Sequence, residues 1–332
     1  MTAFGRSAFL FLVSGLLAAC GGPAAREVVV YTSVDQIFSA PVIARFEERS
    51  GIRVRAVYDT EEAKSTGVVN RLIAEAANPQ ADVFWSGDVF RCLVLKDRDV
   101  VTSHRAPDAV PPGFRDPEGM WTGFSGRARV LVYNREKIQE ALPRSLSDFT
   151  RPERSGQLAI ANPLFGTTTV HVASLFVSLG DDEARALFDG LKANGARMVG
   201  SNSETLRAAL AGDVSFGLTD TDDAFVALRD GAPVGLLFPD QEGPGTLFMP
   251  NAVSLVRGGP NPKEGQELID FLLSSEVEAL LRESAGQIPL LPGTAPPAGL
   301  NLETLRWMDV DYEAVARKVE EIQPYLRTWA GM

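Results

Sequence analysis

The chain has 332 residues, of which 45% are hydrophobic and 23% charged, and its formal net charge is −11. This composition is ordinary for a folded globular protein, and the length is sufficient for two domains with their own cores. The acidic balance excludes nucleic acid as an expected partner, because no basic face is available to displace counterions. His104 and His171 lie far apart in sequence, so a zinc site of the usual spacing is not expected. Cys92 stands between apolar residues and is expected to be buried rather than reactive.

The N-terminus has the layout of a secretory signal peptide. Arg6 precedes an apolar run too short for a stop-transfer helix, and small residues lead to Cys20. The sequence Leu-Ala-Ala-Cys at 17–20 resembles the bacterial lipobox, in which the cysteine is acylated and becomes the first mature residue. We expect a signal peptide over 1–19, a lipidated tether over 20–26, and a periplasmic or cell-envelope location, anchored to a membrane by lipid alone. The alternative is a plain signal peptide with a chance cysteine.

The first third of the chain alternates between strand and helix patterns. The pattern predicts strands at 27–31, 53–58 and 81–85, a helix from Ser39 to Gly51, and a helix at 64–77. Strands and helices that alternate at this spacing indicate a parallel α/β sheet.

The same pattern resumes after residue 128 and ends with a returning strand. The predicted elements are strands at 129–133, 157–161, 214–218, 234–238 and 248–256, and helices at 167–179, 182–194, 203–211, 222–230, 262–284 and 312–328. A late strand that returns after a second α/β unit suggests two lobes joined by crossing segments.

Several of these segments resemble one known family. They are the strand ending in Val-Tyr-Thr-Ser at 30–33, Ala-Asp-Val-Phe-Trp at 81–85, Ser-Gly-Arg-Ala-Arg-Val at 125–130 and Ser-Asn-Ser at 201–203. In these the chain is similar to the ferric-iron-type periplasmic solute-binding proteins of bacterial ABC importers. The resemblance covers nearly all of 27–330 and implies an α/β, two-lobed periplasmic-binding-protein-like fold of type II. Each lobe would be a mixed, mostly parallel sheet flanked by helices, with the ligand cleft between the lobes.

The resemblance also implies a domain division and a function. Lobe 1 would comprise 27–127 and about 252–298, and lobe 2 would comprise 128–251 and about 299–332. The expected protein is not an enzyme but a monomeric lipoprotein that captures ligand and delivers it to the permease and ATPase subunits of an importer. It would need no cofactor, and Fe3+ with carbonate or phosphate would be its transported ligand.

The metal ligands that the resemblance carries over differ in this chain. The family offers a His after the first strand, a Glu after the Ala-Asp-Val-Phe strand and a Tyr pair in the second lobe. Those positions fall here on Asp35, on Gly87 and on Thr221 with Asp222. Asp88, one residue after Gly87, can supply the carboxylate that is missing there.

Carboxylates follow the carboxyl ends of several predicted strands, where open α/β sheets bind ligands. They are Asp35, Glu61, Glu62, Asp88, Asp220, Asp222 and Asp223. Oxygen ligands of this kind suit a hard cation or an ammonium group, and we name Asp35, Asp88, Asp220 and Asp222 as the candidate metal ligands. The alternative is that the aspartates at 220–223 only cap the helix that follows.

A second set of residues suits an anion. Gly166, Thr167 and Thr168 open a helix, whose first N–H groups and dipole favour negative charge. By the resemblance, Gly166, Thr167 and Asn202 lie where the family binds its accompanying anion, and Arg127 where relatives hold carbonate. Ser33 can add a hydroxyl at the end of the first strand. The alternative is a threonine cap, with Arg127 in a structural ion pair.

Other ligands and two other classes remain open at this point: an exported hydrolase, and a tethered sensor subunit that uses the same fold to report ligand to a membrane receptor. The same cleft can bind a small phosphonate, an aminophosphonate or a phosphorylated sugar without metal. An exported hydrolase would need one protonated and one ionised carboxylate, and no nucleophile elbow, zinc-binding helix or phosphate loop is present in the sequence.

Overall fold

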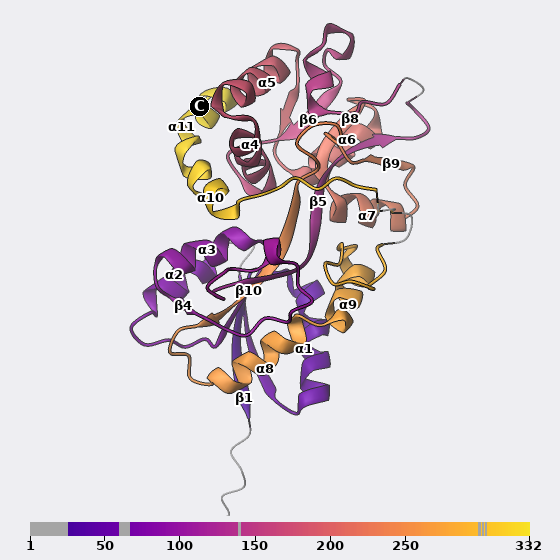
Figure 1. The fold of residues 1–332 in the computed structure, drawn as a ribbon. Helices are drawn as coiled ribbons and strands as arrows, with labels where there is room; N and C mark the ends of the chain where they lie inside the picture. The colour runs from indigo at the N-terminus through magenta and orange to yellow at the C-terminus, as the bar shows by residue number, and fades with distance from the viewer. Residues whose placement is uncertain (1–25, 60–66, 139–140, 298–299, 301, 303) are drawn as a thin grey trace, which may run out of the picture.

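The computed structural model describes residues 26–59, 67–138, 141–297, 300, 302 and 304–332. Figure 1 shows two α/β lobes, one above the other, with two long strands, β5 (Thr122–Asn134) and β10 (Phe248–Val256), running between them. The expected two-lobed α/β fold is confirmed.

The lower lobe in Figure 1 has a mixed sheet covered by helices on both faces. Its strands pair in the order β2-β1-β3-β10-β5; β1, β2 and β3 are parallel, and β10 is antiparallel to β3 and β5. Alternate residues of β1 enter two different cores, Val28 and Val30 on one face and Val29 and Tyr31 on the other. The elements are β1 (Glu27–Thr32), α1 (Gln36–Ser50), β2 (Arg53–Tyr58), α2 (Gly67–Ala74), β3 (Val83–Ser86), α3 (Val89–Asp97), β4 (Val101–Thr102), η2 (Pro112–Phe114), α8 (Pro262–Leu272) and α9 (Ser275–Ala285).

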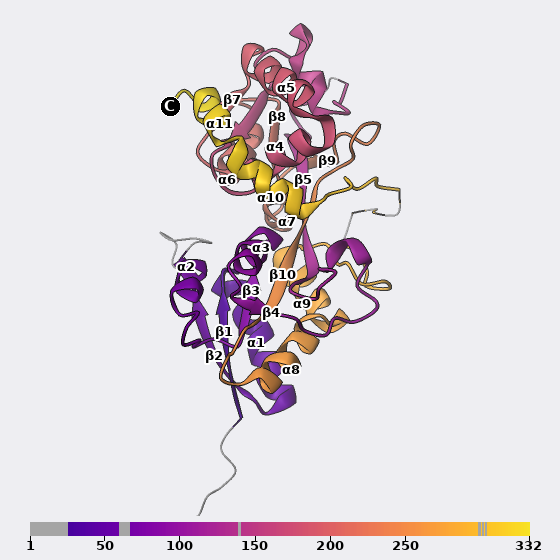
Figure 2. The ribbon, with the colours of Figure 1, turned by 60° about the vertical axis from the view of Figure 1, so that its left-hand side comes forward.

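The upper lobe is built around the second half of β5. This part of β5 is antiparallel to β8 and β9, and β6 lies parallel to both β8 and β7. The C-terminal helices α10 and α11 lie beside α4 and α5, so the end of the chain returns to this lobe (Figure 2). The elements are η3 (Leu146–Thr150), η4 (Pro152–Arg154), β6 (Leu158–Ala161), α4 (Gly166–Leu179), α5 (Asp181–Ala193), β7 (Arg197–Val199), α6 (Asn202–Ala211), β8 (Phe216–Asp220), α7 (Thr221–Arg229), β9 (Val234–Leu237), α10 (Tyr312–Glu321) and α11 (Gln323–Ala330).

β5 changes partners where it passes from one lobe to the other. Its residues 122–128 pair with β10, and its residues 129–134 pair with β8 and β9. The register with β10 shifts by one residue near Ser125, whose φ is 37°. Beside this bulge the two strands approach so closely that a Cβ at Gly126 would lie 2.8 Å from the Cα of Pro250. Only glycine fits there.

Several expected element boundaries are wrong, for local reasons. Helix α1 begins at Gln36, because the first turn forms around the carbonyl of Asp35, and the Ser39 hydroxyl donates back to that carbonyl (3.0 Å) instead of capping. The long helix expected at 262–284 is two helices, and the Ser274 side chain caps the second. The helix expected at 312–328 is likewise broken, at Ile322 before a proline.

The structure describes only the end of the N-terminal segments expected from the sequence. Cys20 and residues 1–25 lie outside the described residues. Arg26, the last residue of the expected tether, forms ion pairs with Glu264 and Glu267 and is therefore attached to the fold. Among the described residues, no helix combines the length and the apolar character that crossing a membrane requires.

Candidate ligand-binding site

A cavity of about 340 Å³ lies between the lobes. Residues from both lobes line it: Ser33, Val34, Asp35, Phe38, Gly87, Asp88, Arg127, Gly166, Thr167, Asn202, Asp220, Asp222, Asn251, Ala285 and Gln287. Nine of the eleven ligand-binding residues expected from sequence are among them. Of the other two, Thr168 is buried behind the wall and Glu61, like its neighbour Glu62, lies outside the described residues.

Five helix N-termini converge on this cavity, which explains why polar residues from distant parts of the sequence meet there. Asp35 and Asp88 stand at the N-cap positions of α1 and α3, and Asp220 stands at that of α7. Gly166 and Asn202 are the first residues of α4 and α6. The N-terminus of a helix carries partial positive charge and unpaired N–H groups, so this arrangement stabilises negative charge in the cavity.

The α4 terminus is open towards the cavity. Gly166 has φ of +62°, a conformation that strains other residues, and α4 begins without a side-chain cap. The threonine cap, which was the alternative to an anion site, is therefore not formed at this helix. The hydroxyl of Thr167 donates instead to Asp220 (2.8 Å).

A buried guanidinium group organises the upper wall of the site. Arg129 has no exposed surface and donates to Asp220 Oδ1 (2.7 Å), Thr167 Oγ1 (3.1 Å) and Asn202 Oδ1 (3.1 Å). Its second terminal nitrogen donates to Thr168 Oγ1 (3.3 Å). Sequence reasoning did not single out Arg129, which makes the shorter of two ion pairs to Asp220; Arg127 makes the other, as the alternative role for that residue expected.

Arg127, two residues earlier on β5, lies at the cavity itself. Its side chain is 19% exposed, donates to the carbonyl oxygen of Gly87 (3.1 Å), and lies 3.6 Å from Asp220. Burial by itself would lower the pKa of Arg127, but the nearby carboxylates of Asp222, Asp220 and Asp88 outweigh it and raise that pKa. Arg127 therefore stays charged and bridges the two lobes.

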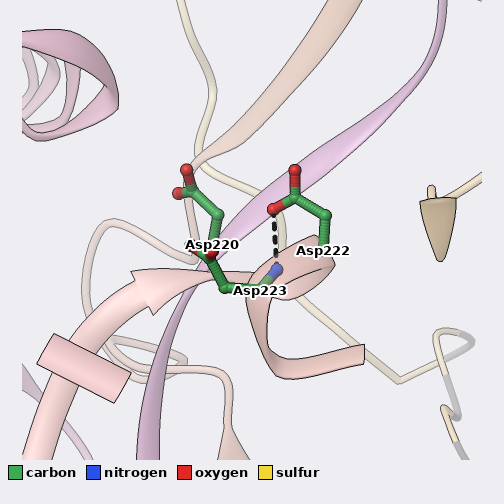
Figure 3. Close-up of side chains that lie close together, drawn as sticks. All are labelled: Asp220, Asp222 and Asp223. Atoms are coloured by element: carbon green, nitrogen blue, oxygen red, sulfur yellow. Dashed lines mark hydrogen bonds between the residues drawn. The ribbon is translucent and has the colours of Figure 1, made fainter. Parts of the chain in front are cut away.

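Three aspartates at the start of α7 lie close together, with one ligand oxygen of each within 4.8 Å of the others. Figure 3 shows the carboxylates of Asp220 and Asp222 pointing to the same side of the first helical turn. Asp220 Oδ2 accepts hydrogen bonds from Thr167 and Asn202, and Asp223 accepts from Ser203 and Thr219. The carboxylates of Asp220 and Asp223 are therefore already hydrogen-bonded to side chains of the protein.

Asp222 differs from both neighbours. Its Oδ1 accepts a hydrogen bond from the backbone N–H of Asp223 (3.1 Å), drawn as a dashed line in Figure 3. Among the described residues, no side chain donates to it. Burial raises the pKa of Asp222 to about 7, because it outweighs the attraction of Arg127, and the charges of Asp220 and Asp223 act in the same direction as burial. Asp222 is thus a carboxylate at the wall of the cavity that has a backbone donor but, among the described residues, no side-chain donor.

The alternative, in which these aspartates only cap α7, does not hold for Asp220. Asp220 occupies the N-cap position of α7 but makes no side-chain capping bond. On the opposite lobe Asp88 does cap its helix, accepting from the N–H of Arg91 (3.2 Å), and its side chain remains 19% exposed. Asp88 can hold a ligand with its remaining lone pairs.

The charge of the site is negative. Among the described residues, the acidic side chains that line the cavity are those of Asp35, Asp88, Asp220 and Asp222, and the arginines beside them are Arg127 in the lining and Arg129 behind Asp220. With all four carboxylates ionised, these described groups carry a formal excess of two negative charges. Oxygen donors that face one another across a cleft, in negative excess, suit a hard cation.

Sequence reasoning missed two amides in the wall, Asn251 and Gln287. Asn251 is buried and donates to the side-chain oxygen of Gln287 (2.6 Å) and to the carbonyl of Ser125 (3.3 Å). The available signal was Asn251, which directly follows a proline in the largely apolar 248–256 segment.

Residues 78–314 match the profile of a protein family described as bacterial extracellular solute-binding protein. The chain belongs to this family. As a solute-binding protein it is not an enzyme, and one relative, from Sinorhizobium fredii, is named a probable ABC transporter periplasmic-binding protein. The match includes four of the five helix N-termini at the cavity and leaves out that of α1.

Relatives of this solute-binding protein carry different ligand names. It is 29% identical over 312 residues to the iron uptake protein A1 of Synechocystis sp., covering 86% of this chain and 85% of the relative. It is 24% identical over 289 residues to a putative 2-aminoethylphosphonate-binding periplasmic protein of Salmonella paratyphi A, covering 86% and 80%. Its fold matches that of the Trichodesmium protein IdiA (FutA) in complex with iron and citrate ligands, with a TM-score of 0.80, 22% identity, and coverage of 91% and 98%.

Proposed function

We propose that this chain is the ferric-iron-binding component of an ABC importer, which captures Fe3+ in the cleft and delivers it to a membrane permease. The observation that carries the proposal is Asp222, a carboxylate without a side-chain donor, in a cavity that Asp35 and Asp88 line from the other lobe. Ferric iron is a small, hard cation that binds oxygen, and ligands from both lobes would let it stabilise the closed form.

The proposed iron ligands are aspartates in place of the aromatic pair of ferric-binding relatives. Among the described residues that line the cavity there is no tyrosine and no histidine. Iron bound by phenolate has a strong ligand-to-metal charge-transfer band in the visible, whereas the charge-transfer absorption of iron bound by carboxylates and water lies mainly in the near ultraviolet. The iron-loaded protein should therefore lack the red colour of a ferric phenolate complex.

The accompanying anion would bind on the upper wall. Arg127 and the open N-terminus of α4 at Gly166 offer a guanidinium group and backbone N–H donors to carbonate or phosphate. An anion there would offset part of the ferric charge and complete its coordination.

A metal-free organic ligand is less well supported by the charge of the cleft. A phosphorylated sugar carries net negative charge, and the formal excess of two negative charges among the described groups of the cleft would repel it. An aminophosphonate, the ligand named for the Salmonella relative, carries an ammonium group and is the better of the two alternatives.

The remaining expectations complete the proposal. We propose lobe boundaries of 27–127 with 252–298 and 128–251 with 299–332, a monomeric protein, and a lipid anchor at Cys20. Replacement of Cys20 by serine should release the protein from membranes, and continued membrane association would contradict the anchor.

The test is thermal unfolding of residues 21–332, stripped of ligand with a chelator, against ferric iron with carbonate or phosphate, 2-aminoethylphosphonate and a hexose phosphate. A ligand at ~100 times its Kd adds about 2.7 kcal/mol to stability. Stabilisation by iron with an anion, lost in Asp222→Ala and weakened in Arg127→Ala, would support the proposal. Stabilisation by the phosphonate alone, or equal affinities in both variants and wild type, would refute it.

A further inference from the structure

Glu278 on α9 is a fully buried carboxylate that pairs with backbone amides instead of a cation. Its Oε1 accepts from the N–H of Ser125 (2.9 Å) and of Leu290 (2.8 Å), and its Oε2 accepts from the N–H of Leu291 (2.9 Å). A buried charge of this kind is costly to keep, and burial raises the pKa of Glu278 in spite of the three bonds. Its position therefore requires an explanation.

The amide of Ser125 belongs to the bulge in β5. Phe124 pairs with Asn251 and Gly126 with Pro250, so Ser125 is the extra residue between two consecutive partners of β10. The carbonyl of Ser125 accepts from the side chain of Asn251 (3.3 Å). Glu278 and Asn251 together supply, from their side chains, the hydrogen bonds that the bulged residue cannot make within the ladder.

The bulge determines where the next residues of β5 point. Side chains alternate along a strand, so one extra residue reverses the face that every later residue presents relative to the segment before it. Arg127 follows the bulge by two residues and lines the cavity, where it donates to Gly87 O (3.1 Å). Arg129 follows by four residues and holds the upper wall.

Glu278 also holds the chain segment after α9, which passes beside the bulge. Leu290 and Leu291 follow Ile288, which exchanges two backbone hydrogen bonds with Gly126 (2.8 and 2.7 Å). Gln287, in the cavity wall, is the residue before Ile288. One carboxylate thus joins α9, the bulge and the returning segment at the point where the chain crosses between lobes.

We propose that Glu278 is a positioning residue for ligand binding: it holds the Ser125 bulge that aims Arg127 into the cleft. The proposal rests on the proposed function for its ligand, but its geometry does not depend on which ligand binds.

The test is Glu278→Gln, which keeps the shape and removes the charge and one acceptor. Glu283→Gln, an exposed carboxylate on the same helix with a 68% exposed side chain, is the matched control. Ferric iron supplied as its citrate complex is the probe, measured by calorimetry on folded protein. We expect Glu278→Gln to bind iron citrate about tenfold more weakly than wild type, because loss of one hydrogen bond to a charged group corresponds to about a tenfold change in Kd. The control should bind iron citrate as wild type does.

A double-mutant cycle separates positioning from general weakening of the fold. If Glu278 acts through Arg127, the Arg127→Ala/Glu278→Gln protein binds no more weakly than Arg127→Ala alone. A Glu278→Gln protein with wild-type affinity, or losses that add up in the double variant, would overturn the proposal. If Glu278→Gln does not fold, Glu278→Asp, which keeps the charge but is one methylene too short to reach all three amides, takes its place in the same cycle with the same two outcomes.

A crystal structure of Glu278→Gln gives a readout that needs no ligand. We expect the Arg127 guanidinium to have left Gly87 O, and an unchanged contact would overturn the proposal. If the wild-type protein binds no iron citrate, the proposed function fails, and this contact alone then decides whether Glu278 positions Arg127.

Discussion

Asp222→Asn should make the ligand-free protein more stable and at the same time abolish its affinity for a metal. Asparagine has nearly the same shape, and its carbonyl oxygen can still accept the hydrogen bond from the N–H of Asp223 (3.1 Å). What the substitution removes is the negative charge, which burial and two neighbouring aspartates disfavour.

The size of the effect follows from the pKa. Burial raises the pKa of Asp222 from 3.8 to about 7, and each unit corresponds to about 1.36 kcal/mol, which gives an upper limit of about 4 kcal/mol. The folded-state pKa lies above the unfolded one, so wild-type stability is full below about pH 4 and falls until the pH has passed about 7. Partial solvent contact reduces the penalty, and we expect Asp222→Asn to gain about 2–4 kcal/mol at pH 8 and less than half of that at pH 5.

The assay is urea unfolding of chelator-treated protein at pH 5 and pH 8, read as the shift in midpoint at unchanged m-value. Asp230→Asn, at the other end of α7 with a 68% exposed side chain, is the matched control and should shift the midpoint little at either pH. The reasoning is refuted if Asp222→Asn equals wild type at pH 8, or if its gain is the same at both pH values. A gain in stability with a loss of binding would mark Asp222 as a residue kept for function.

Three further predictions follow from the same site and from the lobe contacts. Arg129→Met should cost about 3–5 kcal/mol in urea unfolding, because it removes the nearest and fully buried charge partner of Asp220, and Arg127→Met should cost clearly less; equal costs would contradict the structural role of Arg129. Iron affinity should rise up to about tenfold per pH unit between about pH 5 and 7 as Asp222 loses its proton, and a pH-independent affinity in calorimetry would count against Asp222 as a ligand. Gly286→Ala should lower the thermal midpoint more than Gly258→Ala: both glycines have φ near +65°, but only a Cβ at 286 would meet an aromatic ring of α7, at 2.5 Å. Equal shifts of the thermal midpoint would mean that backbone strain alone acts in both variants, which would contradict the predicted clash with the ring.

Much of the fold could be predicted because its signals are local. The apolar run at 27–31 identifies a strand covered on both faces, and the structure buries Val28 to Tyr31 in two cores. Aspartates at strand ends were expected at the ligand edge of the sheet, and Asp35, Asp88, Asp220 and Asp222 do line one cavity. Parallel strands bring their carboxyl ends to one edge whatever the details of the packing, so the set of wall residues follows from topology.

The roles within that set were decided by tertiary structure. Arg127 lies two residues before Arg129, the first residue of the predicted strand at 129–133, and nothing in the sequence shows that Arg129 is the one sealed against Asp220. After the bulge at Ser125 both side chains lie on the same face of β5, and their roles differ because Arg127 pairs with β10 and Arg129 with β8. The bulge itself depends on a carboxylate 153 residues further along the chain. Sequence alone determined the lobes, the edge of the sheet and the acidic character of the cleft, because these depend on composition and periodicity. Tertiary structure decided that Asp222 is the carboxylate without a side-chain donor among the described residues and that Arg127 is the guanidinium group in the cavity wall. Both outcomes depend on single hydrogen bonds between distant segments, which exist only once the chain has folded.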